Sequence, residues 1–304
     1  MTIYIIGAGA IGKALAVCLV RNGKAVELIR GSVDDGSLYN EKLTLKLKTG
    51  QELTAEVKFN CMSNFLELNG LIVLTNKSFG NNELAKKLKE KAINTPIILL
   101  QNGLGIEQPF IENNFQEVYR CVLFATSQSI SKRAVSYRPV AESPIGIIIQ
   151  NNTVLETIIK EINTPEFKFV AEKHLDKIIW KKAIANCVFN SICPLLEVDN
   201  GVFHRNTEAF ILAKRIIKEC VLISKNKGID LEAKEIEDQV ISISRMSDGQ
   251  FISTLQDIRN KKETEIDTLN FEVYRLALQM NLEKQVQETK LLGELIKLKS
   301  ELNR

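Results

Sequence analysis

A glycine-rich motif near the N-terminus constrains the fold of this chain more than any other feature. The motif GAGAIG consists of Gly7, Ala8, Gly9, Ala10, Ile11 and Gly12. It follows the apolar run 3–6, which predicts a buried strand, and it opens a helical pattern at 12–23. The first glycine allows a tight turn, the second lets a pyrophosphate approach, and the third lets the helix pack on the strand. The motif predicts a dinucleotide-binding turn, and a glycine turn without ligand is the alternative.

The end of the second predicted strand, 25–29, indicates which dinucleotide would bind. NAD-specific folds place Asp or Glu at this end, where it binds a ribose hydroxyl. Here Glu27 lies inside the strand, and Arg30 stands at its end. A guanidinium suits a 2′-phosphate, so we expect NADP (NADPH), with Ser32 adding a hydrogen bond. The alternative is a solvated surface arginine.

The rest of the first half continues the alternation of apolar runs and helical patterns. A helix is predicted at 83–91, and strands or shorter extended pieces are predicted at 43–47, 52–59, 71–74, 96–100, 118–124 and 145–149. Continuous apolar strands separated by helices predict a parallel sheet covered on both faces, of the Rossmann type.

Two polar loops follow predicted strands, at the edge where open α/β sheets bind ligands. In the first, 75–77, we expect Lys77 to contact ribose or phosphate. In the second, QNGLG at 101–105, we expect Asn102 to bridge the nicotinamide side and the substrate. The alternatives are an exposed lysine and an ordinary Asn-Gly turn.

Strand patterns end near residue 172, and the spacing of apolar residues becomes helical. Helices are predicted at 173–189, 208–226, 233–246, 265–280 and 284–301. We therefore expect an α/β chain with a Rossmann-type domain at 1–172 and an all-helical domain at 173–304, joined near the extended segment 167–172. The first would bind NADP, and the second would carry the substrate and the catalytic groups.

The segment WKKAIANCVFN at 180–190 is apolar around most of a helix, which predicts burial. Lys182, Asn186 and Asn190 nevertheless recur every fourth residue, within an arc of roughly 80°. A buried lysine and two buried amides are costly unless they have polar partners, and a polar ligand would supply them. The alternative is a solvent-facing stripe, to which Lys181 could belong.

A second polar segment, STLQDIRNKKETEID at 253–267, leads into the helix predicted at 265–280. Thr264 and Asp267 match a looser form of the capping box, which predicts Glu265 in the first turn of that helix. A carboxylate there interacts favourably with the helix dipole without any ligand. Periodicity leaves open whether Glu265 faces Lys182.

Together these segments resemble the ketopantoate reductase (2-dehydropantoate 2-reductase) family nearly from end to end. The resemblance rests on GAGAIG at 7–12, Arg30, Lys77, and the segments at 101–105, 180–190 and 253–267. It implies that Lys182 donates a proton to the ketone oxygen and that Glu265 lies beside it. It also implies that the substrate's carboxylate and hydroxyl groups are held by Asn102, Asn186, Asn190 and Ser253.

The sequence departs from the family pattern at two places. Glycine-rich features are weak in FATSQSISKRAVSYRPVAES at 124–143, which could alter a loop over the cofactor. The proline common before the last helix is missing in MNLEKQVQETK at 280–290. Neither departure touches the residues proposed for the chemistry.

The resemblance implies the NADPH-dependent reduction of ketopantoate to pantoate, a step of pantothenate biosynthesis. We expect the site in a cleft between the domains that closes on ligand binding. Two alternatives remain: a reductase of another branched 2-oxo acid or an imine, and a non-catalytic NADP-binding sensor or partner protein. A sensor has no need of a proton donor, so the presence of Lys182 with Glu265 argues against it. Either a monomer or a homodimer is compatible with the sequence.

Composition excludes several other classes of function. The 40 basic and 37 acidic residues give a net charge of only +3, so nucleic acid and membrane surfaces are not expected partners. Lys13 and three glycines interrupt the apolar stretch 3–20, which argues against a signal peptide or a membrane span. Six cysteines without a C-x-x-C pair indicate buried thiols in the cytoplasm, and only two histidines argue against a metal site.

Overall fold

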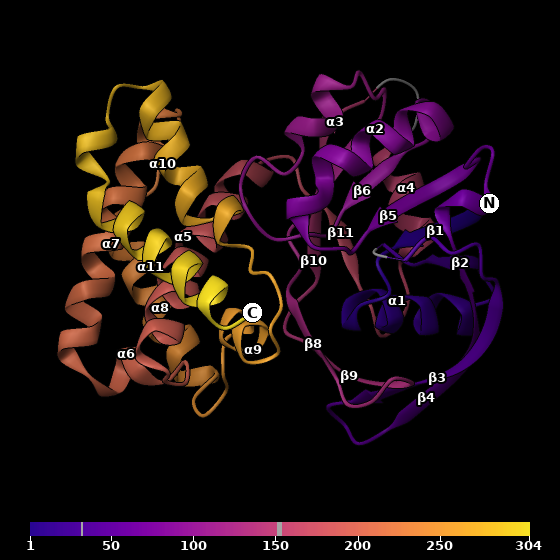
Figure 1. Cartoon of the computed structure of the whole chain (residues 1–304), viewed down its shortest axis with the longest axis horizontal. Coiled ribbons are helices and arrows are strands. Elements are labelled where there is room, and N and C mark those ends of the chain that lie inside the picture. The colour runs from indigo at the N-terminus through magenta and orange to yellow at the C-terminus, as the bar shows by residue number, and fades with distance from the viewer. Residues whose placement is uncertain (32, 151–153) are drawn as a thin grey trace. The chain divides into compact units, whose positions relative to one another are not determined.

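The computed structural model describes residues 1–31, 33–150 and 154–304. The chain forms two compact units, which we call unit 1 and unit 2. Unit 1 comprises Met1–Gln101 and Ile106–Leu175, and unit 2 comprises Asn102–Gly105 and Asp176–Arg304. Unit 1 contains the sheet and unit 2 is helical, which confirms the predicted α/β class with a helical second half (Figure 1).

The sheet of unit 1 has the strand order β11-β10-β7-β6-β5-β1-β2-β4-β3-β9-β8. Its parallel part consists of β1 (Thr2–Ile6), β2 (Ala25–Ile29), β4 (Glu52–Asn60), β5 (Gly70–Leu74), β6 (Ile97–Leu99) and β7 (Val118–Cys121). Ile6 pairs in register with both Ile29 and Leu74, the last residues of β2 and β5. The loops after these three strands therefore begin at one edge of the sheet.

Both faces of this parallel part are covered at its centre, which explains why β1, β5 and β6 are almost entirely apolar. Ile3 and Ile5 pack into one cluster with α1 (Ala10–Arg21). Tyr4 and Ile6 point to the other face and pack with residues of α2 (Asn81–Ala92) and α3 (Gln108–Glu112). Side chains of successive strand residues point to opposite faces of the sheet. A strand that is covered on both faces therefore needs apolar residues at odd and even positions alike.

The outer strands of the sheet extend beyond what the sequence predicted. β3 (Tyr39–Leu47) and β4 form one long antiparallel pair where two shorter pieces were predicted. The predicted strand 118–124 ends at Cys121. The segment expected to be an altered loop forms a hairpin of β8 (Ala125–Ser129) and β9 (Ala134–Pro139), and β9 pairs with β3. Unit 1 ends with β10 (Ser143–Ile149), α4 (Leu155–Ile162) and β11 (Phe169–Ala171).

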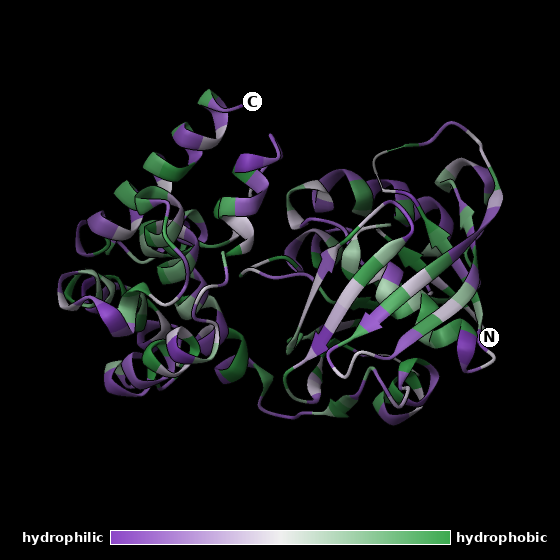
Figure 2. Cartoon of the chain, turned by 90° about the horizontal axis from the view of Figure 1, so that it is seen from below, coloured by the Kyte–Doolittle hydropathy of each residue, from purple (hydrophilic) through white to green (hydrophobic). Residues whose placement is uncertain are grey.

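Unit 2 is built around α5 (Leu175–Leu196), whose apolar side chains form the centre of its core. Figure 2 shows hydrophobic and hydrophilic residues alternating along its helices. The other helices are α6 (Val202–Arg205), α7 (Thr207–Asn226), α8 (Ala233–Met246), α9 (Ser253–Arg259), α10 (Asn270–Gln279) and α11 (Gln287–Leu302), with short 3-10 turns η3 (Ile266–Thr268) and η4 (Glu283–Gln285).

Two helix boundaries in unit 2 correct the prediction. Helix α5 continues past residue 189 to Leu196 and includes Pro194 in its last turn. The helix predicted to begin at 265 begins at Asn270, after the separate turn η3. The short helices α6 and α9 were not predicted.

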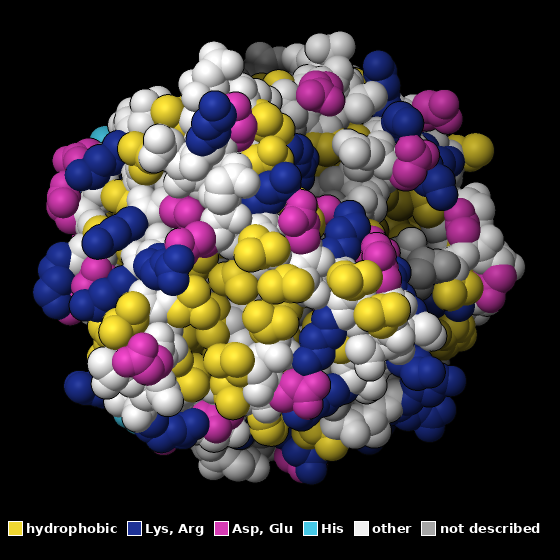
Figure 3. All heavy atoms as spheres, turned by 60° about the vertical axis from the view of Figure 1, so that its left-hand side comes forward, with side chains coloured by type: hydrophobic (Ala, Val, Ile, Leu, Met, Phe, Trp, Pro, Cys, Tyr) yellow, Lys and Arg dark blue, Asp and Glu magenta, His cyan; other side chains and the backbone are white. Residues whose placement is uncertain are grey.

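Hydrophobic side chains also gather on one face of the molecule, bordered by charged ones (Figure 3). Helix α11 contributes four exposed leucines to the surface, at 291, 295, 298 and 302. Across the described ranges, no helix combines the length and the apolar character needed to cross a membrane.

Candidate functional site

The glycine turn after β1 has a backbone path and a close packing that only glycine permits at two of its positions. Gly7 has a φ of 117°, and a Cβ on it would lie 2.8 Å from Cα of Asn76. A Cβ on Gly12 would lie 2.6 Å from Oγ1 of Thr75, so only glycine lets α1 pack this closely. A Cβ on Gly9 would meet no other described residue within 4 Å apart from its chain neighbours. Gly9 caps α1, so this open space lies at the helix N-terminus, where N–H groups attract phosphate.

Thr75 secures this turn from the neighbouring strand, a role that the sequence did not reveal. Its hydroxyl lies 2.8 Å from the carbonyl oxygen of Gly7, to which it donates a hydrogen bond. The backbone N–H groups of Thr75 and Asn76 both donate to the carbonyl oxygen of Ile6. The end of β5 therefore fixes the start of the glycine turn.

Arg30 follows β2 at the same edge and is largely buried. Its Nη2 donates to Oδ1 of Asp35 at 2.6 Å and lies 2.7 Å from Sγ of Cys61. It also donates to the Ser37 hydroxyl, and the guanidinium lies 5.7 Å from the centre of the Tyr39 ring. The hydrogen bond that Arg30 donates to Asp35 raises the pKa of Arg30 above its ordinary value, so the residue is a permanent cation.

The other predicted residues near this edge are Glu27, Lys77 and Ser32. Glu27 is bound within the strands, where its carboxylate accepts from Nζ of Lys58 at 2.6 Å and from Nδ2 of Asn60 at 3.1 Å. Lys77 is half-buried between β5 and the 3-10 turn η2 (Ser78–Gly80). Ser32 lies outside the described residues.

The QNGLG loop begins at a buried amide pair in unit 1. The side chains of Gln101 and Asn81 exchange two hydrogen bonds, of 2.9 and 2.7 Å, and Asn81 also donates to the carbonyl oxygen of Ile106. Both ends of the short segment 102–105 are thereby tied to the N-terminus of α2. Asn81 thus holds both ends of this segment in place, and no local pattern in the sequence indicates it.

Residues 102–105 themselves belong to unit 2, where they lie against the turn η3. The N–H of Leu104 donates to the carbonyl oxygen of Thr268 at 2.7 Å. Gly103 has a φ of 113°, and a Cβ there would lie 2.6 Å from Cβ of Thr268. Both the positive φ and the lack of room for a Cβ therefore require glycine at 103. The close approach of Gly103 to Thr268 places the half-buried residue Asn102 next to this turn.

Helix α5 carries the predicted polar stripe on an otherwise buried surface. Between 183 and 190 every residue is buried except Asn186, which is half-buried like Lys182. Asn190 is only 4% exposed. Lys181 does not belong to this stripe, because its Nζ binds the carboxylate of Glu235 on α8.

The Asn190 side chain is held in one orientation by residues of α9. Its Oδ1 accepts from the Thr254 hydroxyl at 2.8 Å and from the Ser253 hydroxyl at 3.4 Å. Its Nδ2 donates to the carbonyl oxygen of Asn186 at 3.1 Å. The structure thus joins the predicted residues Ser253 and Asn190, and it adds Thr254, which the sequence did not single out.

Glu265 lies at the start of η3 and is half-buried, so the prediction that it stands in the first turn of an α-helix is wrong. No side-chain cap bond forms at the start of η3 or of α10, so the predicted capping box is absent from this part of the described chain. The backbone turns back instead, because the N–H and the hydroxyl of Thr268 both donate to the carbonyl oxygen of Glu265 at 3.1 Å.

The predicted site residues therefore fall into two sets. Unit 1 holds the residues assigned to the cofactor alone, namely Gly7, Ala8, Gly9, Ala10, Ile11, Gly12, Arg30 and Lys77. Unit 2 holds Asn102, assigned to both cofactor and substrate, and the residues Lys182, Asn186, Asn190, Ser253 and Glu265. Within unit 2, Thr268 links the loop of Asn102 to the turn of Glu265. The convergence of Lys182 and Glu265 on one substrate stays a prediction.

Comparison with protein-family models identifies the family. The model described as "Ketopantoate reductase PanE/ApbA" matches residues 3–147, and the model of the C-terminal part of the same family matches residues 174–300. The chain belongs to the ketopantoate reductase family. These enzymes use NADPH, and the protein is accordingly an NADP-dependent oxidoreductase.

Individual proteins of this family are similar to the chain over nearly its full length. The chain is 28% identical to 2-dehydropantoate 2-reductase of Pyrococcus horikoshii, over 99% of this chain and 98% of the relative. Its fold is similar to that of dimeric ketopantoate reductase from Staphylococcus aureus, with a TM-score of 0.81, 18% identity and complete coverage of both chains. It is equally similar in fold to D-mandelate dehydrogenase solved with NADH and anilino(oxo)acetate, with a TM-score of 0.83, 19% identity, and coverage of 100% and 99%.

Proposed function

We propose that this protein reduces ketopantoate (2-dehydropantoate) to pantoate with NADPH, the reduction that serves pantothenate biosynthesis. The observation that carries the proposal is the polar stripe of Lys182, Asn186 and Asn190 on a helix that is otherwise buried at 183–190. Each of these side chains carries N–H donors, and the carboxylate of a small anionic substrate is a strong acceptor for such donors. The relatives named 2-dehydropantoate 2-reductase support the choice of substrate.

The residues of unit 1 fit an NADP molecule. The open space at Gly9 and the N-terminus of α1 suit its pyrophosphate, while Arg30 provides a cation for the 2′-phosphate. Lys77 would add a second cation near ribose or phosphate. When bound, NADPH supplies the hydride that adds to the ketone carbon of the substrate.

Lys182 supplies the proton in this proposal. Negative charge develops on the ketone oxygen as the carbon is reduced, and an ammonium at 182 stabilises that charge and donates its proton. The proposal places Glu265 beside the lysine, where its carboxylate would attract the ammonium group and hold it at the substrate. General acid catalysis of this kind contributes about 10²–10⁴ in rate.

The amide and hydroxyl groups of unit 2 orient the substrate. The Nδ2 atom of Asn190 carries two hydrogens, and one is used by the Asn186 carbonyl. We assign the second hydrogen, with the side chains of Asn102, Asn186 and Ser253, to the carboxylate and hydroxyl groups of ketopantoate. Every residue of this site comes from one chain, so the proposal holds for a monomer and for a homodimer alike.

A second candidate is the reduction of a different 2-oxo acid. It is favoured by the similarity in fold to D-mandelate dehydrogenase, which was solved with NADH and an oxoacetate derivative. The cytoplasm is the compartment that we propose for either reaction, because all six cysteines are buried free thiols, as expected where disulfides do not persist.

A substrate panel tests the proposal and separates the two candidates. Ketopantoate and a series of branched, linear and aromatic 2-oxo acids are assayed by the loss of reduced-nicotinamide absorbance, with NADPH and with NADH. We expect the highest kcat/KM for ketopantoate with NADPH. A higher kcat/KM for another acid would replace the substrate, and binding of NADPH without turnover of any acid would replace the enzymatic role.

A further inference from the structure

The loop between β2 and β3 brings a carboxylate onto the cation that we assign to the 2′-phosphate. Oδ1 of Asp35 accepts from Nη2 of Arg30 at 2.6 Å. The same oxygen accepts from the backbone N–H of Ser37 at 3.0 Å and from its hydroxyl at 2.7 Å. These hydrogen bonds hold the pKa of Asp35 far below its ordinary value, so the group is a carboxylate at any working pH.

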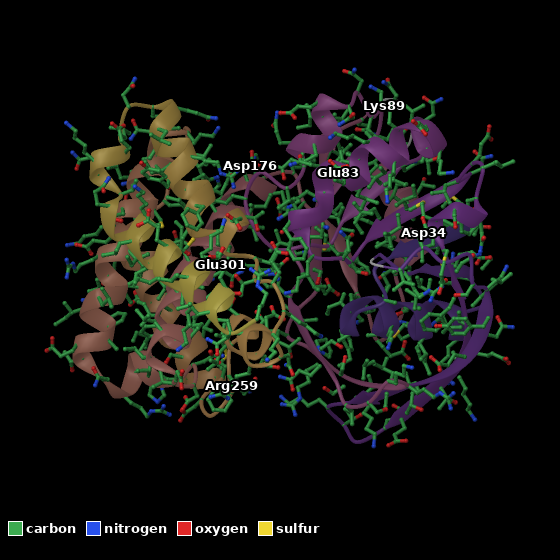
Figure 4. All side chains as sticks on the ribbon, in the orientation of Figure 1. Asp34, Glu83, Lys89, Asp176, Arg259 and Glu301 are labelled. Atoms are coloured by element: carbon green, nitrogen blue, oxygen red, sulfur yellow. The ribbon has the colours of Figure 1, made fainter. Side chains whose placement is uncertain are left out.

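The position of Asp35 is set by the loop that carries it. The neighbouring carboxylate of Asp34, labelled in Figure 4, accepts from the backbone N–H of Ser63 at 2.9 Å. The side chain of Asn64 donates to the carbonyl oxygen of Gly36 at 3.1 Å. Residues on both sides of Asp35 are thus tied to the 3-10 turn η1 (Met62–Asn64), which keeps the carboxylate near Arg30.

The contact engages one nitrogen, Nη2, of the Arg30 guanidinium. Nη2 has two hydrogens, yet it already lies near Asp35 and near Ser37 and Cys61. A 2′-phosphate that binds at Nη2 must share this nitrogen with the carboxylate or displace it, and one that binds elsewhere on the guanidinium still lies close to the carboxylate. The carboxylate also repels the phosphate, whereas a free ribose hydroxyl carries no charge and meets no such repulsion.

We propose that Asp35 is a specificity-determining residue that competes with the 2′-phosphate for Arg30 and so narrows the preference of the protein for NADPH over NADH. The inference rests on the proposed function only in assigning Arg30 to the 2′-phosphate. Asp35 is half exposed, so its effect is reduced by solvent and salt and is moderate in size.

The test measures binding, independently of turnover. Dissociation constants of NADPH and NADH are determined from nicotinamide fluorescence for the unmodified protein, Asp35→Asn and the control Glu83→Gln. The control removes an equal charge from α2, where the partner of Glu83 is Lys86. We expect Asp35→Asn to tighten NADPH binding about three- to tenfold at low salt and less in 0.5 M salt, with NADH changed less than about twofold. Glu83→Gln should leave both constants unchanged.

Two results would overturn the role of Asp35: unchanged or weaker NADPH binding in Asp35→Asn, or an equal gain for both cofactors. The variant Arg30→Ala separates this failure from failure of the underlying assignment. If Arg30→Ala weakens NADPH selectively while Asp35→Asn has no effect, only the competition is wrong. If Arg30→Ala weakens both cofactors equally, the 2′-phosphate assignment itself is wrong. In the Arg30→Ala background, Asp35→Asn should tighten NADPH binding by a smaller factor. The guanidinium for which Asp35 and the 2′-phosphate compete is then absent.

Discussion

The Thr254 hydroxyl donates a hydrogen bond of 2.8 Å to Oδ1 of Asn190, and both side chains are buried. This contact decides which way the amide points, because its oxygen is directed to α9 and its nitrogen toward the carbonyl of Asn186. If the Asn190 amide could rotate, its Nδ2 would no longer be held in the position from which we propose that it donates to the substrate.

Thr254→Val should therefore weaken substrate binding while the fold persists. The isosteric change leaves Oδ1 of Asn190 with only the longer hydrogen bond from Ser253. Loss of the Thr254 hydrogen bond costs about 1–3 kcal/mol in the free energy that holds the amide in this orientation. We expect the KM for ketopantoate to rise roughly tenfold, as a loss of about 1.4 kcal/mol implies, with the KM for NADPH unchanged. Thr254→Ser keeps the hydroxyl and is the control. If valine and serine give the same KM, Thr254 has no positioning role.

Adjacent lysines on α5 give a matched pair for testing the proton donor. Lys182→Ala should lower kcat at least about a hundredfold while NADPH still binds, because general acid help is lost. Lys181→Ala removes the same charge one residue away but breaks only the ion pair with Glu235, so kcat should change less than about threefold. Single-turnover rates and fluorescence titration of NADPH provide the two readouts. Near-normal turnover in Lys182→Ala would remove this residue from the mechanism.

The sequence predicted those elements best whose stability depends on a continuous apolar pattern. The runs 3–6 and 71–74 correspond to β1 and β5, because a strand buried on both faces is apolar at every position. The hairpin of β8 and β9 was missed for the opposite reason. Its residues are mixed in polarity, and five of the eleven are exposed. The hairpin is held by pairing with β3, about 90 residues earlier in the chain.

The candidate site shows the same limit of prediction. Spacing along one helix predicted the stripe from Lys182 to Asn190, since period and burial are local properties. Thr75 and Thr254 were not recognised, because each bonds a residue more than 60 positions away and has no local signal of its own. The capping pattern at Thr264 gave a wrong helix start, because the hydroxyl of Thr268 stabilises a separate turn at Glu265.

Two glycines of the first turn should respond differently to alanine. Gly9 has an ordinary backbone conformation and open space at its Cβ position, so Gly9→Ala should leave the melting temperature within about 2 °C. The methyl group would, however, occupy the space that we assign to the pyrophosphate, and NADPH binding should weaken at least about tenfold. Calorimetry and fluorescence titration measure the two effects. Unchanged NADPH affinity in a stable Gly9→Ala protein would place the pyrophosphate elsewhere.

Gly12→Ala should instead act on the fold. Its methyl group would overlap the Thr75 hydroxyl and the Gly7 carbonyl, so α1 must shift from the sheet. Overpacking of this kind costs about 1–3 kcal/mol, and the melting temperature should fall by several degrees. A Gly12→Ala protein as stable as Gly9→Ala would contradict the packing role of the third glycine.

The loop of Asn102 offers the last test, because Gly103 is constrained twice. Alanine at 103 must accept a φ of 113° and a contact of 2.6 Å with Cβ of Thr268, whereas alanine at Gly50 has a φ of 85° and open space. Gly50→Ala therefore reports the backbone penalty alone, on the order of 1–3 kcal/mol. Gly103→Ala should lose more stability and also raise the KM for ketopantoate, since the loop can no longer lie against η3. If Gly103→Ala lowers stability but keeps the KM of Gly50→Ala, the position of Asn102 is unimportant for the substrate.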